Sequence, residues 1–450
     1  MEIVNYIWAW LAVWLAGIWV AIGQWILAKK SVEVMWRNKE LRSFFLTITI
    51  LGIALVESAV IYWLIIAFQI LWNEAISISA SIWAWLAVWL AWMWAWIWEW
   101  KLVWWAISAI DRNPEMKWKI MTLMVLFIAL VESAAIYWLV VSFKILWADD
   151  YSSMAFLWMW LSIWLAWLWV SIWEWMLAEK SMEVIWNRPK MTWFFLTITI
   201  LGIALVESAA IYWLIVAFQL FNKEFISLFA PVWAWLAIWL AWLWAWVWEW
   251  LLVSWALSWI SRNPEIKWKI MTLMVLFIAL VESAAIYWLV VSFKILWLDD
   301  NGSMIYLWAW LAIWLAWLWV SIWEWYLSKW SLEVIWKNPK ISGFMLTISI
   351  LWIALLESAA IYWLIIAFQI LSIEWLWWLG WLAWIWAWLA IWLTWLWAWI
   401  WEWFLIKWAV DWMNVAPESR GKILTFMVLF VALIEVVAIY WLIIAFKVLW

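Results

Sequence analysis

The sequence predicts an all-α membrane protein in which twelve transmembrane helices form six tandem helical hairpins. Of its 450 residues, 73% are hydrophobic and 12% are charged, a balance that would leave a soluble domain without a polar surface. A similar segment recurs about every 75 residues. Each repeat contains two apolar runs of about 25 residues. At about 1.5 Å per residue, each run is long enough to cross a bilayer core of about 30 Å.

The repeats place six hairpins end to end, at 1–74, 75–150, 151–224, 225–300, 301–374 and 375–450. In the first hairpin we expect helices from Tyr6 to Ala28 and from Phe44 to Trp72, joined by a loop rich in Lys and Arg. The next four loops contain Arg112-Asn113-Pro114, Asn187-Arg188-Pro189, Arg262-Asn263-Pro264 and Lys337-Asn338-Pro339, and the sixth, from Asn414 to Lys422, is degenerate.

The charge distribution predicts the orientation of the hairpins. The hairpin loops are basic, whereas the links between hairpins are short and mostly acidic, as at Asp149-Asp150. Because basic loops stay in the cytoplasm, we expect the hairpin loops there and both termini outside, in the inner membrane of a bacterial cell. The first apolar run, from about Ile7, belongs to the first repeat and is expected to be retained. Near the outer ends of the second helices, we interpret three lysines as snorkelling anchors: Lys144, Lys294 and Lys447.

The composition also excludes several classes of function. The sequence has no Cys and no His, which excludes disulfides, thiolate metal sites, histidine ligation of haem and His-based catalytic triads. The formal net charge of −4 is too small to predict a nucleic-acid partner.

A carboxylate recurs near the middle of every second helix, at Glu57, Glu132, Glu207, Glu282, Glu357 and Glu435. A charge at that depth is costly, so we interpret each of these residues as part of a functional site. A polar residue recurs 33 positions earlier, in the first helix, at Gln24, Glu99, Glu174, Glu249, Glu324 and Glu402. Both positions lie about 13 residues from the hairpin turn, so the two side chains are expected to meet at one depth.

The residues around these carboxylates predict ion binding. A serine follows each helix-two Glu except Glu435, and a Tyr lies five residues after each. A carboxylate, a hydroxyl, a backbone carbonyl and a helix-one amide or carboxyl form an oxygen-rich cage that suits a hard monovalent cation, whereas a bare carboxylate suits a proton. Two carboxyls at one site cannot both ionise cheaply, so one is expected to stay protonated. The alternative is a structural clamp between helices, worth about 1–2 kcal/mol, but six copies at constant spacing favour ion binding.

The pattern resembles the c subunit, or proteolipid, of the F-type rotary ATP synthase. The resemblance rests on one helix-two carboxylate per hairpin and on the loops Arg112-Asn113-Pro114 and Arg262-Asn263-Pro264. It implies a rotor ring (c-ring) whose loops, including Arg37 and Asn38, contact the central-stalk subunits. The other implied partners are a stator a-type subunit, further copies of the chain or single-hairpin c subunits, and membrane lipid. It implies no catalysis by the chain alone and no cofactor besides transported Na+ or H+.

The Glu-Ser-x-x-x-Tyr pattern is similar to the sodium-binding subgroup of that family. In the second hairpin this resemblance implies that Glu99, Glu132, Ser133 and the Leu130 carbonyl hold the ion, and that Tyr137 supports Glu132. The corresponding serines are Ser58, Ser208, Ser283 and Ser358, and the tyrosines are Tyr62, Tyr212, Tyr287, Tyr362 and Tyr440. Val436 replaces the serine in the sixth hairpin, where we expect a proton or a weakly bound sodium ion.

The first helices depart from the family in being rich in tryptophan instead of glycine. The chain has 72 Trp and 8 Gly, and its tryptophans occur at all depths although membrane Trp favours the interfaces. Reading each Trp as Gly restores a family-like first helix. We therefore hypothesise that UGA codons for glycine have been translated as tryptophan, for example at Trp92, Trp96 and Trp100. A deliberate glycine-to-tryptophan design is the alternative.

Other functions fit the sequence less well. A V/A-type rotor proteolipid is considered because fused hairpins are more familiar in that group, and a sodium channel-like oligomer is a related alternative. An engineered Trp-rich membrane scaffold without transport belongs to a different class. The unequal outer links and the decayed sixth unit favour a natural sequence over that design.

Overall fold

The computed structural model describes residues 2–72, 77–147, 153–221, 230–297, 303–372, 402–413 and 417–431, with residues 400, 415 and 433. All regular elements in these ranges are helices, which confirms the predicted all-α class. The predicted site residues Glu435 and Tyr440, with Val436 and Lys447, lie outside the described residues.

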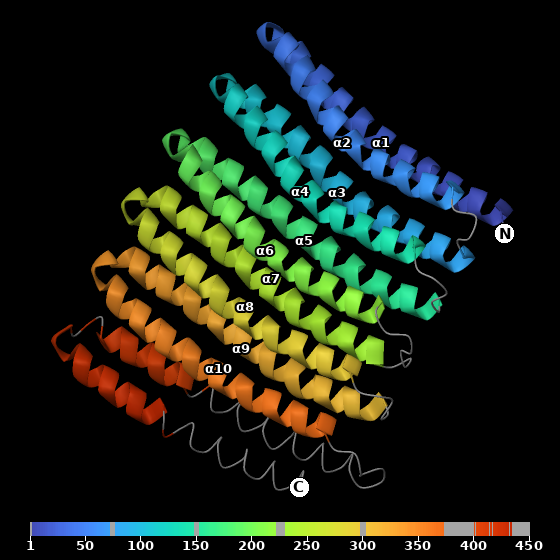
Figure 1. Cartoon of the computed structure of the whole chain (residues 1–450). Helices are drawn as coiled ribbons and strands as arrows, with labels where there is room; N and C mark the ends of the chain where they lie inside the picture. Colours follow the sequence, from blue (N-terminus) through green and yellow to red (C-terminus); the bar gives the residue numbers. More distant parts are fainter. Residues whose placement is uncertain are drawn as a thin grey trace. The chain divides into compact units, whose positions relative to one another are not determined.

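Helical hairpins follow one another along the described chain (Figure 1). The first comprises α1 (Glu2–Arg37), η1 (Lys39–Leu41) and α2 (Arg42–Trp72), and the second α3 (Ile78–Arg112), η2 (Pro114–Met116) and α4 (Lys117–Leu146). The third comprises α5 (Ser153–Asn187), η3 (Pro189–Met191) and α6 (Thr192–Phe221), and the fourth α7 (Ala230–Arg262), η4 (Pro264–Ile266) and α8 (Lys267–Trp297). The fifth comprises α9 (Ser303–Lys337), η5 (Pro339–Ile341) and α10 (Ser342–Ser372). In the sixth, residues 402–413 and 420–431 are helical on either side of η6 (Pro417–Ser419).

The first helix of the chain is longer than predicted, because it continues through the basic segment that was assigned to the loop. It ends at Arg37, whose guanidinium lies 2.7 Å from Glu33 one turn earlier, a spacing that supports a helix. The hairpins then turn at a short 3-10 helix. In the second hairpin Asn113 leaves the helical conformation, with φ −140° and ψ 84°, and Pro114 begins η2. Proline disfavours the α conformation of the residue before it, so the Asn-Pro sequence ends the helix there.

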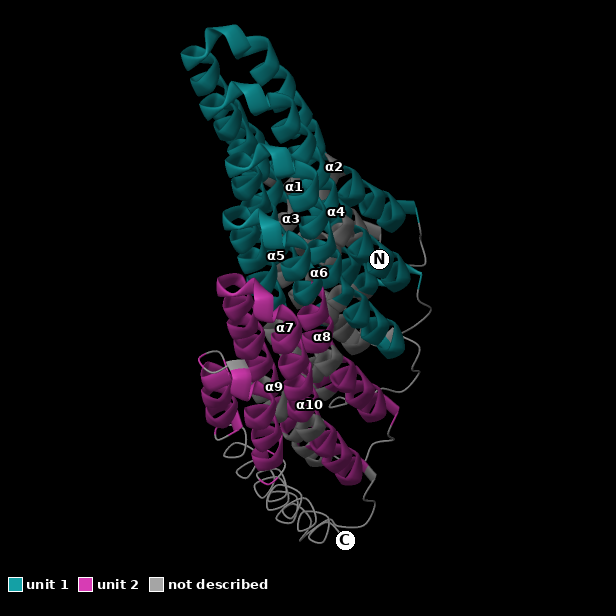
Figure 2. Ribbon diagram, turned by 90° about the vertical axis from the view of Figure 1, so that its left-hand side faces the viewer, with its two compact units in different colours: residues 1–228, 246–274 teal, residues 229–245, 275–450 magenta. Residues whose placement is uncertain are grey.

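The chain divides into two compact units (Figure 2). The first comprises residues 1–228 and 246–274, and the second residues 229–245 and 275–450. In the first unit the helices form two rows, because α3 contacts both α1 and α5 while α4 contacts both α2 and α6. Successive hairpins of this unit therefore lie side by side, with first helices next to first helices and second helices next to second helices. In the second unit α9 packs against α10.

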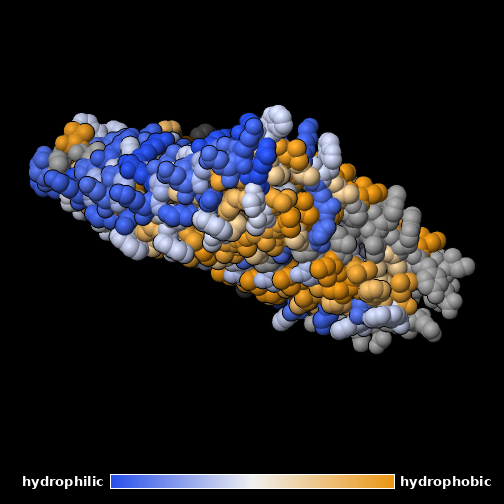
Figure 3. Space-filling model, turned by 90° about the horizontal axis from the view of Figure 1, so that it is seen from above, coloured by the Kyte–Doolittle hydropathy of each residue, from blue (hydrophilic) through white to orange (hydrophobic). Residues whose placement is uncertain are grey.

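Five helices of the described residues are long and apolar enough to cross a membrane: Lys39–Trp72, Pro114–Leu146, Pro189–Leu220, Pro264–Trp297 and Pro339–Leu371. Each contains the second helix of a hairpin. The tryptophan-rich first helices are not among them, so the expected twelve spans stay a prediction. In the space-filling view, a broad hydrophobic area borders hydrophilic side chains on the visible face (Figure 3).

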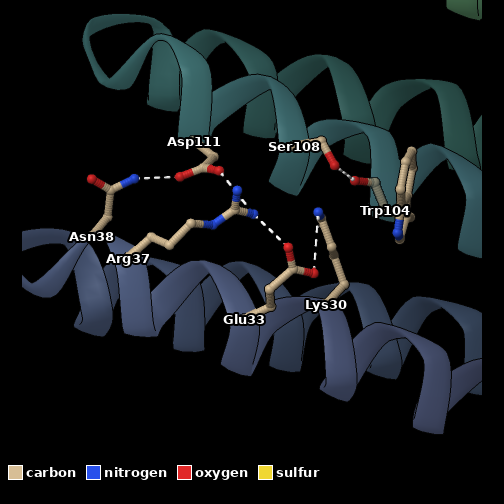
Figure 4. A network of polar contacts seen from close by, with 7 residues as sticks. All are labelled: Lys30, Glu33, Arg37, Asn38, Trp104, Ser108 and Asp111. Atoms are coloured by element: carbon tan, nitrogen blue, oxygen red, sulfur yellow. Dashed lines mark hydrogen bonds and ion pairs between the residues drawn. The ribbon is translucent and has the colours of Figure 1, made fainter.

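A polar network joins the turn ends of the first two hairpins (Figure 4). Asp111, at the end of α3, accepts a hydrogen bond from Asn38 of the first hairpin. It also forms an ion pair with Arg37, whose guanidinium lies 3.4 Å from the Asp111 carboxylate. Lys30 lies 5.2 Å from the ring of Trp104 across the same helix pair. In the third hairpin, Arg188 Nε donates to the Ser261 carbonyl of α7 at 3.0 Å. These contacts align hairpins laterally, although half-exposed ion pairs contribute only about 0–1 kcal/mol each.

The first and fifth hairpins differ from the second and fourth in the hydrogen bond that joins their two helices. In the first and fifth the bond lies near the turn, with Thr49 Oγ1 donating to Ser31 Oγ in the first and Ser331 and Ser349 2.7 Å apart in the fifth. In the second and fourth it lies near the opposite end, where Ser142 donates to the Ala84 carbonyl and Ser292 to the Ala234 carbonyl, both at 3.2 Å. In the third hairpin the equivalent serine, Ser181, has no hydrogen-bond partner among the described residues. Residues 117–147 and 267–297 are identical in sequence. The second and fourth hairpins therefore share both the sequence of their second helix and the hydrogen bond that joins their two helices.

Candidate ion-binding sites

The two polar positions of a hairpin meet across its two helices. Gln24 Nε2 of α1 donates a hydrogen bond to Glu57 Oε1 of α2. In three other hairpins the two carboxyl groups lie close enough to interact electrostatically: Glu99 with Glu132, Glu174 with Glu207, and Glu324 with Glu357. The fourth pair, Glu249 and Glu282, is divided between the two compact units, and Glu402 has its partner outside the described residues.

The two carboxyl groups of a site differ in burial. The helix-one carboxyls are buried, with exposed fractions of 0% for Glu99, Glu174, Glu249 and Glu324 and 1% for Glu402. The helix-two carboxyls are half-buried at Glu132, Glu207, Glu282 and Glu357, and Glu57 of the first hairpin is exposed. The helix-two carboxyl is therefore the group that an ion can reach from outside the hairpin.

Three of the buried carboxyls accept no hydrogen bond from any described residue, namely Glu99, Glu174 and Glu324. A buried, unpaired carboxylate carries a large desolvation cost, and a second carboxylate beside it adds repulsion. Each pair therefore needs a proton or a cation to neutralise it, and the residues present suit either one.

The third hairpin places a serine and a carbonyl of the predicted cage in contact. Ser208 Oγ donates a hydrogen bond to the Leu205 carbonyl at 2.7 Å, one turn before it in α6. Ser208 was a predicted ligand beside Glu207, and the Leu205 carbonyl is equivalent to the Leu130 carbonyl that was predicted for the second hairpin. The side chains of Ser58, Ser133, Ser283 and Ser358 lie outside the described residues.

In the second, third and fifth hairpins, a tyrosine of the preceding hairpin lies beside the two carboxyls. Tyr62 of the first hairpin interacts electrostatically with Glu99 and Glu132 of the second. Tyr137 does so with Glu174 and Glu207 of the third, and Tyr287 with Glu324 and Glu357 of the fifth. All three are half-buried, as are Tyr212 and Tyr362. From the sequence, each Tyr was assigned to the Glu of its own helix. The contact with the next hairpin was not predicted, because the spacing of residues along one helix gives no information about which helix lies beside it.

The loop residues predicted to contact a stalk lie at the hairpin turns. Arg112 and Arg262 are exposed, and Asn113 and Asn263 are half-buried at the turns that Pro114 and Pro264 begin. Arg37 and Asn38 also lie at a turn, where their side chains reach the second hairpin.

We expect Tyr62→Phe to change the reactivity of Glu132 and to leave that of Glu57 unaltered. The hydroxyl lost lies beside the carboxyls of the second site, and a polar contact to a charged group contributes about 1.5–3 kcal/mol. Losing this contact should change the rate at which a hydrophobic carbodiimide labels Glu132 by about tenfold. Tyr212→Phe is the matched control and should leave Glu132 unchanged. An effect of Tyr137→Phe on Glu132 as large as that of Tyr62→Phe would contradict the assignment.

Tandem helical hairpins whose second helices are long and apolar enough to cross a membrane define a class of integral membrane protein. Within that class, the family of ATP synthase C subunits matches three segments of this chain, at residues 7–70, 82–145 and 232–295. These are the first, second and fourth hairpins, and they cover less than half of the chain. In these segments the chain is similar to the C subunit, repeated in tandem.

The chain is also similar to an individual ATP synthase subunit. A stretch of 50 residues is 44% identical to the ATP synthase c subunit 2 of Pelobacter propionicus. The match covers 11% of this chain and 55% of that protein, so the chain spans about half the length of the relative.

Proposed function

We propose that the chain is an ion-translocating rotor-ring subunit of a rotary ATP synthase, in which each hairpin carries one Na+ or H+ on its helix-two Glu. The observation that carries this proposal is the pairing of a buried helix-one carboxyl with a half-buried helix-two carboxyl. It recurs in Glu99 with Glu132 and in Glu174 with Glu207. The three segments similar to the C-subunit family support it.

The two carboxyls have different roles in this proposal. The buried helix-one carboxyl stays protonated and donates a hydrogen bond. The half-buried helix-two carboxylate exchanges the ion with a stator a-type subunit. A neutralised Glu can then move past lipid, whereas a bare carboxylate there is costly, so ion loading permits rotation. The exposed turns, with Arg112 and Arg262, form the surface for central-stalk subunits.

Sodium is the proposed ion of the hairpins that contain the serine. The contact between Ser208 and the Leu205 carbonyl supports this, because it brings two uncharged oxygen atoms together within two residues of Glu207 in α6. The sixth hairpin, with Val436, is proposed to carry a proton. The proposed arrangement is twelve transmembrane helices in a bacterial inner membrane, with cytoplasmic turns. A V/A-type rotor is the alternative assembly, since the chain joins several hairpins.

We also propose that many tryptophans at helix contacts stand for glycines, as the UGA hypothesis predicts. Trp352 occupies the position of Gly52 and Gly202 in the fifth hairpin, and its side chain is 1% exposed. The indole N–H groups of Trp138, Trp213, Trp288, Trp352 and Trp363 are buried, and no described residue accepts their hydrogen bond. Buried indole groups usually have a partner, and each unsatisfied donor costs about 1–3 kcal/mol. Glycine at these positions would remove that cost.

Carbodiimide labelling of the membrane-embedded chain tests the proposed function. The reagent reacts with a protonated carboxyl, and a bound cation excludes that proton. Sodium at about ten times its dissociation constant should slow labelling of Glu132 by about tenfold, and potassium should not. Glu132→Gln should abolish the signal at that peptide, while Glu115→Gln, at the turn, should leave it unchanged.

Two results would separate the alternatives. Labelling that is slowed at higher pH but indifferent to sodium would assign protons as the transported ion. Labelling indifferent to sodium, potassium and pH would overturn the proposal and favour a scaffold without transport.

A further inference from the structure

We propose that the hairpins with two carboxyls also bind the divalent cation Ca2+, which takes the place of the transported ion and of the proton on the helix-one carboxyl. The inference rests on the proposed function for the location of the site, and it names a second class of ligand that competes there. It follows from a difference between hairpins. The first has Gln24 in its first helix, whereas the second, third and fifth have Glu99, Glu174 and Glu324 at the equivalent position.

The first hairpin shows how the two positions meet. Gln24 Nε2 donates a hydrogen bond to Glu57 Oε1, so the helix-one side chain reaches the helix-two carboxyl. The amide is neutral and supplies one oxygen ligand at most. When Glu57 is ionised, this site therefore carries one negative charge, which one monovalent cation neutralises.

The two-carboxyl hairpins place unpartnered oxygens at the same position. Glu99, Glu174 and Glu324 are 0% exposed, and neither oxygen of any of them accepts a hydrogen bond from a described residue. Each interacts electrostatically with the helix-two carboxyl of its own hairpin. Buried polar atoms usually have a partner, so these oxygens indicate a ligand between the two carboxyls.

The charge of the ionised site selects the ligand. Two carboxylates carry two negative charges, and an uncompensated charge is costly inside an apolar body. A sodium ion together with one proton makes the site neutral, and so does a single divalent cation. At Gln24 and Glu57 a divalent cation would leave one positive charge uncompensated. Charge therefore separates the first hairpin from the second, third and fifth.

The chemistry of the oxygens favours Ca2+ among divalent cations. The chain has no Cys and no His, so it lacks the ligands that soft metals prefer. Ca2+ accepts about six to eight oxygens in flexible geometry, whereas Mg2+ requires a regular octahedron and retains its waters. In the third hairpin Ser208 Oγ and the Leu205 carbonyl, 2.7 Å apart, supply neutral oxygens near Glu207, and the Tyr137 side chain lies beside the same carboxyls.

The binding is expected to be weak and competitive. In the described part of the chain, no group of three or more acidic, histidine or cysteine side chains could hold a metal, so each site has only two charged ligands. Calcium sites with few charged ligands have dissociation constants of about 0.1–1 mM. When Ca2+ binds, the sodium ion leaves the helix-two carboxylate and the proton leaves the helix-one carboxyl. The total charge of the site stays the same, and calcium competes with sodium.

Carbodiimide labelling of the membrane-embedded chain tests the calcium site. The reaction is run without sodium, at constant pH and ionic strength, and is measured on the separate peptides that contain Glu57, Glu132 and Glu207. Calcium chloride at about ten times its dissociation constant should slow labelling of Glu132 and Glu207 by about tenfold and leave Glu57 unchanged. Magnesium chloride at the same concentration is the matched control and should change none of the three.

Two variants exchange the deciding residue between hairpins. Gln24→Glu gives the first hairpin a second carboxyl and should make the labelling of Glu57 sensitive to calcium, a gain that a misfolded chain cannot produce. Glu99→Gln should remove the effect of calcium at Glu132. Glu207 in that same chain should keep its sensitivity, and this serves as the internal control for folding.

The other outcomes are distinct. Equal protection of Glu57 and Glu132 by calcium in the unaltered chain would overturn the proposal, because the number of carboxyls would then not matter. Equal protection by magnesium would also overturn it, as would Glu132 labelling that about 10 mM calcium leaves unchanged. Sodium is tested separately. Sodium protection without calcium protection leaves the proposed function standing, whereas calcium protection without sodium protection counts against sodium transport and supports the calcium site.

Discussion

Replacing Gly202 by tryptophan should prevent the folded chain from accumulating in the membrane. A Cβ atom at this position would already lie 2.9 Å from Val253 Cγ1, so no larger side chain fits without moving α6 away from α7. Overpacking by small groups costs about 1–3 kcal/mol, and an indole is far larger. We would measure the yield of monodisperse protein in mild detergent and its midpoint of thermal unfolding, and we expect little protein to be recovered.

Two further variants make this prediction specific. Gly202→Ala should lower the stability by about 1–3 kcal/mol, and Val253→Ala in the same chain should restore most of that loss. Gly343→Trp is the matched control, because an added Cβ there meets no atom within 4 Å, and it should be tolerated. Normal recovery of Gly202→Trp would contradict the prediction. It would also weaken the argument that Trp352, at the equivalent position, stands for a glycine.

Glu207→Gln should reduce ATP synthesis driven by an ion gradient by at least about tenfold in the assembled enzyme, which corresponds to about 1.4 kcal/mol on the limiting step. An amide cannot exchange a proton or neutralise a sodium ion, so the third hairpin would pass the stator without cargo. In the proposed ring all hairpins turn together, so one empty site per chain would block every revolution. The measurement uses proteoliposomes that contain the complete synthase.

The matched control is Glu179→Gln, an exposed carboxyl near the turn end of the same hairpin, and it should leave synthesis unchanged. Glu207→Asp should retain part of the activity, because it keeps the carboxyl and shortens the side chain by one methylene. Unaltered synthesis by Glu207→Gln, with the variant chain present in the enzyme, would show that the third hairpin carries no ion.

The all-α class, the repeated hairpins and the polar pairing found in the first, second, third and fifth hairpins could be predicted from residue order. Apolar runs of membrane length encode helices, and the Asn-Pro sequences mark where the chain turns back. Counting from that turn places Gln24 and Glu57 at one depth because the rise per residue of a helix is constant. These properties depend on residues close together in the chain or on a single reversal of direction.

Lateral packing between hairpins was decided by the tertiary structure. The neighbour of Glu132 across the hairpin boundary is Tyr62, and the neighbour of Gly52 is Val103, about 50 to 70 residues away in each case. Helical periodicity specifies which side chains share a face but not which helix that face meets. The same holds for burial, because Glu57 and Glu132 have similar surroundings in sequence, whereas Glu57 is exposed and Glu132 is half-buried in the structure.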